Sequence, residues 1–282
     1  QSLGRAMVDR ELAPVVSAPV AASPAPVDPV RAPTLRVEGV SVAGEGRAEV
    51  ADVSFDVRPG EIVGIAGVSG NGQRALADAL AGLAELASGR VGLDGVDVSR
   101  ASVRERCTRG LGYIPEDRLG RGVAPGLTVE DNLMLRHYWQ PEFRRGPLLS
   151  RRAIAKQLAA LSARIEVRGA RRGMPISLLS GGNIQRAMLA RELGDETRAL
   201  VVCSPTRGLD IAVTELAHGL LRARRDAGVA IVLISEDLEE VLALSDRVHV
   251  MFRGRLVGTM DRGEVDRTQI GLLMAGGPAE ES

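Results

Sequence analysis

The stretch from Glu61 to Leu80, EIVGIAGVSGNGQRALADAL, constrains the fold of this chain more than any other. It joins a continuous apolar run of buried-strand type to a glycine-rich turn and then to a helical pattern. Gly67, Gly70 and Gly72 let the turn curl until its backbone N–H groups face inward, and the start of the following helix favours anions. The stretch therefore predicts a phosphate-binding loop at the end of a buried strand. A tight turn without a ligand is the alternative.

The loop lacks two side chains that normally hold a metal-bound triphosphate. Gln73 stands where a lysine would contact phosphate, and Arg74 stands where a serine or threonine hydroxyl would hold Mg²⁺. An ammonium about 4 Å from a phosphate oxygen contributes roughly 4 kcal/mol at an effective dielectric near 20, and a neutral amide does not replace it. Lys156 is the only lysine of the chain. We expect weak nucleotide binding with little Mg²⁺ by the loop residues Gly67, Val68, Ser69, Gly70, Asn71, Gly72, Gln73 and Arg74.

Strand and helix patterns alternate along much of the remaining chain. Residues 35–42 and 48–57 alternate like two antiparallel strands, and residues 117–195 contain only helical patterns and loops. Strands that alternate with helices predict a mostly parallel sheet. The expected fold class is therefore α/β, with a parallel core sheet, an antiparallel β edge and a helical subdomain at about 117–195. The further strand-sized apolar runs are 199–203, 229–235 and 247–254.

Composition excludes several classes of protein. The formal net charge is zero, whereas nucleic-acid-binding proteins are usually basic, so we expect no nucleic-acid partner. Cys107 and Cys203 are too few and too far apart for a disulfide framework or a zinc site, and no metal site is expected. No apolar run approaches the roughly 18 residues that cross a bilayer.

The first 34 residues differ from the rest. Six of the fourteen prolines lie in residues 12–34, which read as an extended linker. The chain begins with Gln, and LGRAM near its start repeats the spacing of IGLLM near its end. We therefore expect residues 1–34 to hold the tail of a preceding, similar domain and a linker; chance similarity is the alternative. A nucleotide-binding domain is expected at 35–276 and a short tail at 277–282.

Four ordered motifs identify a family that the chain resembles. The glycine loop is followed by IPEDR, LSGGN, PTRGLD and LISEDL. Their order and spacing resemble the ATP-binding cassette of ABC transporters over residues 35–276, with its P-loop (RecA-like) core. The residues of these motifs resemble those of the second, C-terminal cassette in the fused double-cassette subunits of sugar and nucleoside importers. The glycine loop, which ends in Gln73, resembles that of the nucleoside branch.

The resemblance implies that the chain's own nucleotide site is degenerate. Glu116 stands where the family has a glutamine that senses Mg²⁺ and the membrane partner. Cys203 replaces an aspartate that supports Mg²⁺, and Ser204 replaces the catalytic glutamate. Glu236 replaces the histidine that contacts the γ-phosphate, and residues 40–46 supply no aromatic side chain to stack on adenine. No residue of the chain is therefore expected to catalyse hydrolysis.

The signature motif keeps the family pattern. In the family two cassettes face each other head to tail, and each signature helix closes over ATP held by the other. Asp210 is implied to contact the opposite cassette. The signature residues are Leu179, Ser180, Gly181, Gly182 and Asn183.

The resulting hypothesis is an ATPase component of an importer for sugars or nucleosides. Its signature would complete the site of a partner cassette, where most of the Mg²⁺ would bind, while its own site would hold ATP weakly. The partners would be the first cassette of the same polypeptide or a homologous cassette, and transmembrane permease subunits at the cytoplasmic face of the plasma membrane. The alternative is a docking or regulatory cassette that never closes on ATP. A GTPase is not supported, because the guanine motif Asn-Lys-x-Asp is absent.

Overall fold

The computed structural model describes residues 31–44, 48–146, 148–165, 167, 170–171, 173–263 and 266–277. The expected tail and linker at 1–34 therefore lie outside the described residues up to residue 30, and so does most of the expected tail at 277–282. Within the part of the chain that the structure describes, no helix is both long enough and apolar enough to span a membrane.

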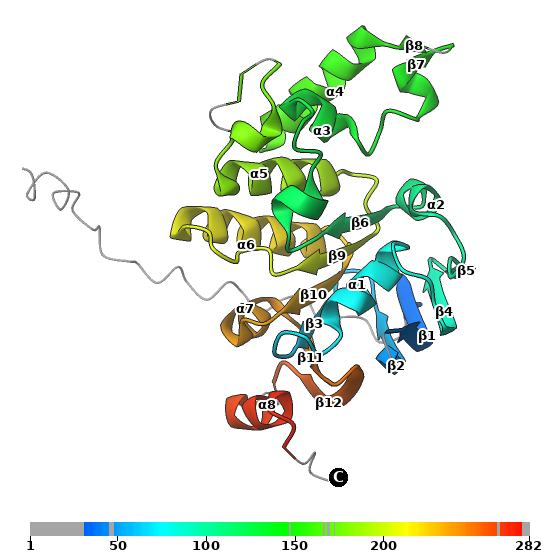
Figure 1. Ribbon diagram of the computed structural model, residues 1–282, viewed down its shortest axis with the longest axis vertical. Helices are drawn as coiled ribbons and strands as arrows, with labels where there is room; N and C mark the ends of the chain where they lie inside the picture. Colours follow the sequence, from blue (N-terminus) through cyan, green and yellow to red (C-terminus); the bar gives the residue numbers. More distant parts are fainter. Residues whose placement is uncertain are drawn as a thin grey trace, which may run out of the picture.

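A mixed, mostly parallel sheet forms the centre of the molecule (Figure 1). Its strand order is β12-β11-β3-β10-β9-β6, and only β12 runs antiparallel to its neighbour. The predicted α/β class with a parallel core sheet is confirmed. The strands are β3 (Ile62–Ala66), β6 (Leu111–Ile114), β9 (Ala199–Cys203), β10 (Ala230–Ser235), β11 (Arg247–Phe252) and β12 (Arg255–Asp261).

An antiparallel sheet packs beside the central sheet. Its order is β2-β1-β4-β5, with β1 (Leu35–Ala43), β2 (Ala48–Val57), β4 (Ser88–Leu93) and β5 (Val96–Asp97). The predicted antiparallel edge is confirmed, since Leu35 pairs with Val57. The alternation at the start of β1 places Leu35 and Val37 in the same buried cluster as Leu76 of α1 (Gln73–Ala81). Strand β4 was not predicted, because its sequence SGRVGL is polar and glycine-rich over its first half.

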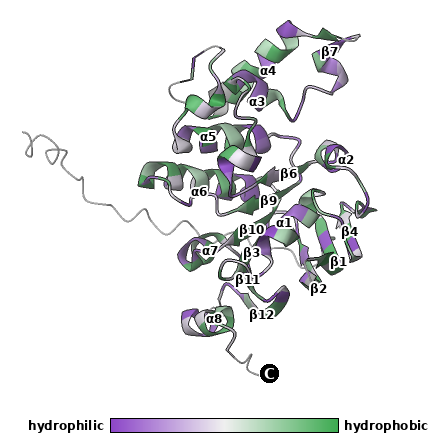
Figure 2. Ribbon diagram, in the orientation of Figure 1, coloured by the Kyte–Doolittle hydropathy of each residue, from purple (hydrophilic) through white to green (hydrophobic). Residues whose placement is uncertain are grey.

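Helices cover both faces of the central sheet (Figure 1). One face, together with the antiparallel sheet, packs on α1 (Gln73–Ala81), and the other packs on α5 (Gly181–Glu192) and α6 (Ile211–Asp226). Alternate residues of β9 serve the two faces: Val201 packs with the α1 side and Leu200 with the α6 side. Figure 2 shows these helices with both hydrophobic and hydrophilic residues, as expected of helices that bury one face. The others are α2 (Val103–Thr108), α6 (Ile211–Asp226), α7 (Leu238–Leu244) and α8 (Arg267–Met274).

A helical layer lies beyond α6, at the top of Figure 1. It contains α3 (Val129–Met134), α4 (Arg151–Arg164) and α5 (Gly181–Glu192), with short helical turns η1 (Arg118–Gly122), η2 (Pro141–Phe143) and η3 (Ile176–Leu178). The prediction of helices and loops alone in 117–195 is wrong in one detail. A short hairpin of β7 (Arg144–Arg145) and β8 (Leu148–Leu149) protrudes from the layer, where two-residue strands are too short to produce a period.

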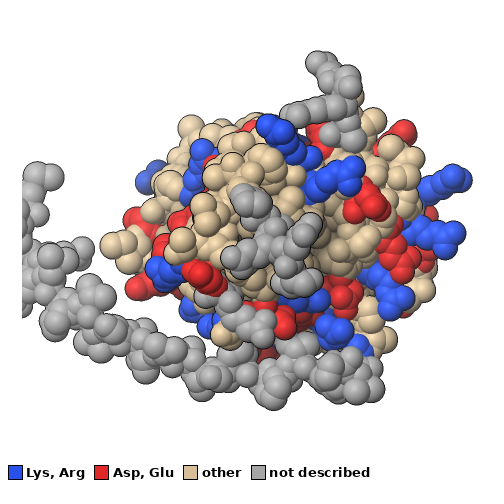
Figure 3. Space-filling model, turned by 90° about the horizontal axis from the view of Figure 1, so that it is seen from below, with Lys and Arg blue, Asp and Glu red and all other residues tan. Residues whose placement is uncertain are grey.

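Acidic and basic side chains are interspersed on the face shown in Figure 3, as the zero net charge suggests. Arg247 forms partly buried ion pairs where the two sheets meet. Arg247 bonds Glu61 at 2.9 Å and lies 3.4 Å from Asp56, which joins β11 to β2 across the two sheets. Because these charges are paired inside one chain, they stabilise the junction of the two sheets and are not free to bind a partner.

Candidate functional site

The glycine loop lies between β3 and α1, and two of its own side chains form hydrogen bonds within it. Gly70 and Gly72 have φ of 83° and 101°, which only glycine adopts readily. Gln73 is buried, and its amide Nε2 donates to the Val68 carbonyl at 2.9 Å. The Asn71 side chain donates to the same carbonyl at 3.1 Å. Gln73, at the lysine position, is therefore directed at the loop itself.

A cavity of about 680 Å³ opens beside this loop, where β3, β6, β9 and β10 end. Carboxyl ends of parallel strands meet at one edge of a sheet, which is where such folds bind ligands. The cavity brings together residues that the sequence had placed in four separate motifs. Its functional lining includes Ser69, Gly70, Gln73, Arg74, Glu116, Cys203, Ser204 and Glu236.

Four arginines also line the cavity, and three have partners within the fold. Arg121 bonds Asp78 at 2.8 Å. Arg118 donates to the Gln185 side chain at 2.9 Å and to a backbone carbonyl of the loop after β9. Arg207 contacts Glu116 and lies 3.7 Å from Glu236, so both unexpected acids of the motifs share one cation. The fourth arginine, Arg74, is exposed and forms no hydrogen bond or ion pair with the described residues.

The end of β9 carries a thiol and a hydroxyl instead of two carboxylates. Burial raises the pKa of Cys203 to about 12, so its thiol is protonated at neutral pH and cannot ligate a metal as thiolate. Ser204 follows with φ of 40° and donates its backbone N–H to the Ile234 carbonyl at 2.8 Å. Among the described residues, no group of three or more His, Cys, Asp or Glu side chains could hold a metal ion.

A buried polar network around Glu240 lies next to the cavity, and the sequence patterns did not reveal it. The Glu240 carboxylate accepts from Thr206 at 2.5 Å and from Ser235 at 2.7 Å, and it lies 3.3 Å from Nε2 of His218. Burial alone would raise the pKa of Glu240, but these hydrogen bonds hold it below its ordinary value. The network ties the loop after β9 to α7. Its only sequence signal was an acid on the buried face of the EDLEE helix.

The signature residues form the exposed start of α5, and none of them lines the cavity. Ser180 and Gly181 are exposed, and a Cβ on Gly181 would meet nothing within 4 Å. A Cβ on Gly182 would lie 3.2 Å from Val213, so α5 and α6 begin side by side. Asp210 caps α6 by accepting from the Val213 N–H at 2.9 Å. The buried Leu179 precedes this surface, and the exposed Ile211 follows Asp210.

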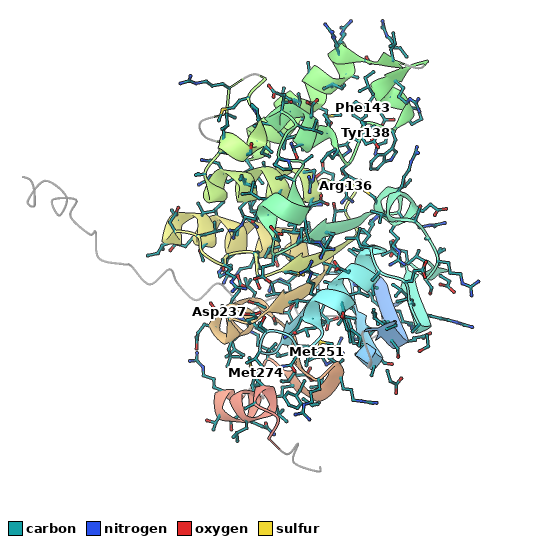
Figure 4. All side chains as sticks on the ribbon, in the orientation of Figure 1. Arg136, Tyr138, Phe143, Asp237, Met251 and Met274 are labelled. Carbon is teal, nitrogen blue, oxygen red and sulfur yellow. The ribbon has the colours of Figure 1, made fainter. Side chains whose placement is uncertain are left out.

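A second cavity, of about 520 Å³, separates the helical layer from the core near β6. It combines exposed apolar side chains, such as Leu83 and Tyr138, with five arginines and only one acid, Glu192. Arg136 lies at its inner end, close to the sheet, and Tyr138 and Phe143 lie further along the helical layer (Figure 4). Arg136 bonds Glu192 at 2.6 Å, yet its buried Nη2 has no hydrogen-bond partner.

The fold and the first cavity define a nucleotide-binding domain of the P-loop type, with its glycine loop between a buried strand and a helix. The ABC transporter family matches residues 50–207, more than half of the chain, and the chain belongs to that family. Members of this family bind ATP, usually with Mg²⁺.

Curated relatives show the same assignment at moderate identity. The guanosine import ATP-binding protein NupO of Bacillus subtilis is 36% identical over 252 residues, which are 89% of this chain and 49% of NupO. The nucleoside import ATP-binding protein NupA of Lactococcus lactis is 37% identical over 236 residues, 84% of this chain and 47% of NupA. The chain thus spans about half the length of the curated relatives it matches.

Solved structures support the fold. An ATP-binding subunit of an ABC transporter superposes with a TM-score of 0.69 at 20% identity, covering 86% of this chain and 99% of that chain. At this identity the likeness concerns the fold alone.

Proposed function

We propose that this chain is the nucleotide-binding segment of an ABC importer whose own ATP site is degenerate and whose signature completes the site of a partner cassette. The observation that carries the proposal is the contrast between two surfaces of one fold. The exposed start of α5 keeps Ser180, Gly181 and Asn183, whereas the cavity at the glycine loop has lost the groups for metal and hydrolysis.

The chemistry of the cavity supports a site that does not hydrolyse ATP. A carboxylate base usually contributes about 10² to 10⁴ in rate, and Ser204 at that position has no carboxylate. Gln73 is engaged with the Val68 carbonyl. Glu236 and Glu116 place negative charge on the cavity wall, with Arg207 between them. These features together make attack on a metal-bound γ-phosphate at this cavity unfavourable.

The surface around the signature supports a role for a neighbour. Backbone N–H groups at the start of a helix attract an anion, and Ser180 and Gly181 at the start of α5 are exposed. The adjoining loop ends at Asp210, and Ile211 beside it is 79% exposed. We infer that this face meets a second cassette.

The partner cassette belongs, in this proposal, to the same polypeptide. The relatives are about twice as long as the matched region, so each has room for a second domain of this size. Residues 1–34 would then be the tail of the first cassette and a linker, 35–276 the second cassette with its helical subdomain at about 117–195, and 277–282 a short tail. A homologous cassette on a separate chain is the other source of the same face.

The second cavity supports contact with a permease. It is concave, it is lined by exposed apolar side chains, and it lies between the helical layer and the core. Apolar surface of this kind marks an interaction site. The names of the relatives favour nucleosides or sugars as cargo. The chain would work at the cytoplasmic face of the membrane, attached through that permease.

ATP hydrolysis by the separate and the combined parts tests the proposal. The 282-residue chain alone is expected to hydrolyse Mg-ATP at close to the background rate, and the chain assembled with its partner cassette is expected to do so at an ordinary rate. Hydrolysis by the chain alone at the assembled rate would refute the degenerate site. Absence of any gain on assembly would favour a docking or regulatory cassette.

A further inference from the structure

The metal that normally accompanies ATP does not fit the residues of this cavity. Mg²⁺ requires hard oxygen ligands in octahedral geometry, usually one or two carboxylates with phosphate oxygens. The end of β9 supplies the protonated thiol of Cys203 and the hydroxyl of Ser204. Both motif acids, Glu116 and Glu236, are engaged with Arg207, and the third acid of the cavity, Asp117, accepts from the Gly120 N–H at 2.9 Å. The position of the usual hydroxyl ligand is held by a cation, Arg74.

Arg74 differs from every other arginine of the cavity. Asp78 neutralises Arg121, and the two acids Glu116 and Glu236 neutralise Arg207. Arg118 is held by neutral acceptors on other elements. Arg74 is exposed in the first turn of α1, lines the cavity and has no partner among the described residues. Its guanidinium is therefore free to bind a ligand without breaking an existing contact.

The backbone around Arg74 is shaped for an anion. α1 begins at Gln73, and Arg74 lies in the turn whose N–H groups carry the positive end of the helix dipole. A Cβ on Gly70 would meet nothing within 4 Å, so space remains above the loop. Guanidinium groups bind phosphate oxygens through two parallel N–H donors. The loop, the helix start and this side chain converge on one opening.

We propose that the cavity binds an adenine nucleotide without Mg²⁺, with Arg74 holding the phosphates in the place of the metal. This inference rests on the proposed degenerate site and adds the ionic form of its ligand. The nucleotide is held and not cleaved, and its free phosphate charge is matched by Arg74 and the helix start. Bound Mg²⁺ would cancel two of the ligand's negative charges and bring a divalent cation towards Arg74. Adding the metal should therefore weaken binding here, whereas it strengthens binding at a site with carboxylate ligands.

The test is calorimetric titration of the full 282-residue chain with ADP, which excludes hydrolysis as a complication. Titrations are run in EDTA and in excess Mg²⁺. We expect the wild-type chain to bind ADP more tightly in EDTA. Tighter binding in Mg²⁺, or no binding in either condition, would overturn the proposal. Neither of these results bears on the signature, whose role is measured by hydrolysis in the assembled pair, so the two proposals fail separately.

Variants at Arg74 assign the effect to this side chain. Because Arg74 is exposed, R74A should leave the fold intact and weaken ADP binding in EDTA about tenfold or more, the loss expected for a charge-assisted contact. R74K should retain most of the affinity, and R74T should bind weakly in EDTA and no longer lose affinity in Mg²⁺. The control R90A removes an exposed arginine of β4, outside the cavity, and should match wild type. Wild-type affinity in R74A, or a full Mg²⁺ penalty in R74T, would overturn the role of Arg74.

Discussion

Replacing Arg106 removes the cap of the helix that follows the glycine loop. The guanidinium of Arg106 is 2% exposed. It donates to the carbonyls of Ala79 at 2.6 Å and Leu80 at 2.7 Å, in the last turn of α1, and to those of Ser99 at 3.0 Å and Ala101 at 3.2 Å. The same side chain explains why residue 82 is a glycine, since a Cβ there would lie 2.9 Å from the Arg106 Nε. One side chain thus satisfies four carbonyl oxygens at the junction of α1, β5 and α2.

The magnitude follows from the four acceptors. In the variant R106M the buried carbonyl of Leu80 loses its donor, at about 1 to 3 kcal/mol, and the partly buried carbonyls of Ser99 and Ala101 lose theirs at up to about 1 kcal/mol each. The Ala79 carbonyl keeps the Gly82 N–H at 3.2 Å. The helix also loses a cation at its negative end, worth about 0.3 to 1 kcal/mol. Relief from burying a charged group offsets part of this loss. We expect the free energy of unfolding to fall by about 2 to 4 kcal/mol, a large share of the 5 to 15 kcal/mol typical of a domain.

Urea unfolding followed by circular dichroism measures this loss. The variant R106K is the matched comparison, because an ammonium keeps the charge and can satisfy at most three of the four carbonyls. It should lose about half as much stability as R106M. A loss below about 1 kcal/mol in R106M would refute the reasoning, since it would mean that the four carbonyls find other donors or water.

Two further predictions concern the core and the loop. Burial lowers the pKa of His249 to about 4, so the folded state keeps this imidazole neutral. The contribution of the neutral imidazole to stability is complete above pH 6.5 and is lost as the pH falls towards 4. Between neutral pH and pH 5, urea unfolding should show a fall of about 2 kcal/mol in the free energy of unfolding, and H249Q should lack that fall. The variant G72A should lose about 3 kcal/mol or more, because φ is 101° and a Cβ would overlap the Glu49 carbonyl oxygen. The control G95A, with φ of 76° and open space, should lose only about 1 kcal/mol by the same measurement.

Apolar patterns predicted three strands that are buried on two sides and two that bury one face. β3, β9 and β10 are continuous apolar runs because both of their faces are covered, and the strong pattern of β1 and β2 reflects one buried face. The strands that were not predicted are β4, β5, β6, β12 and the β7–β8 hairpin. They are short, polar or rich in glycine, so they leave no period to detect. Long-range pairing of such strands depends on neighbours that are remote in sequence.

The sequence predicted several of the residues that line the cavity, but it did not predict the contacts among their side chains. Motif positions brought Gln73, Cys203 and Glu236 to one place, and the structure lines one cavity with them. That Gln73 turns back to the Val68 carbonyl, and that Arg207 joins the two motif acids, are matters of side-chain geometry with no trace in residue spacing. Glu240 was overlooked for the same reason: a glutamate on a helix usually faces water, and only the fold buries this one.

The central claim is that the start of α5 serves a neighbour's nucleotide. The most direct measurement is the ATPase rate of the assembled transporter carrying S180R in this chain, compared with S88R. Ser88 is an exposed serine on β4, away from α5, so S88R controls for an added surface arginine. The account predicts that S180R lowers the rate about a hundredfold, as loss of an aligned anion-binding helix start should, while S88R leaves it unchanged. Equal rates in the two variants would contradict it.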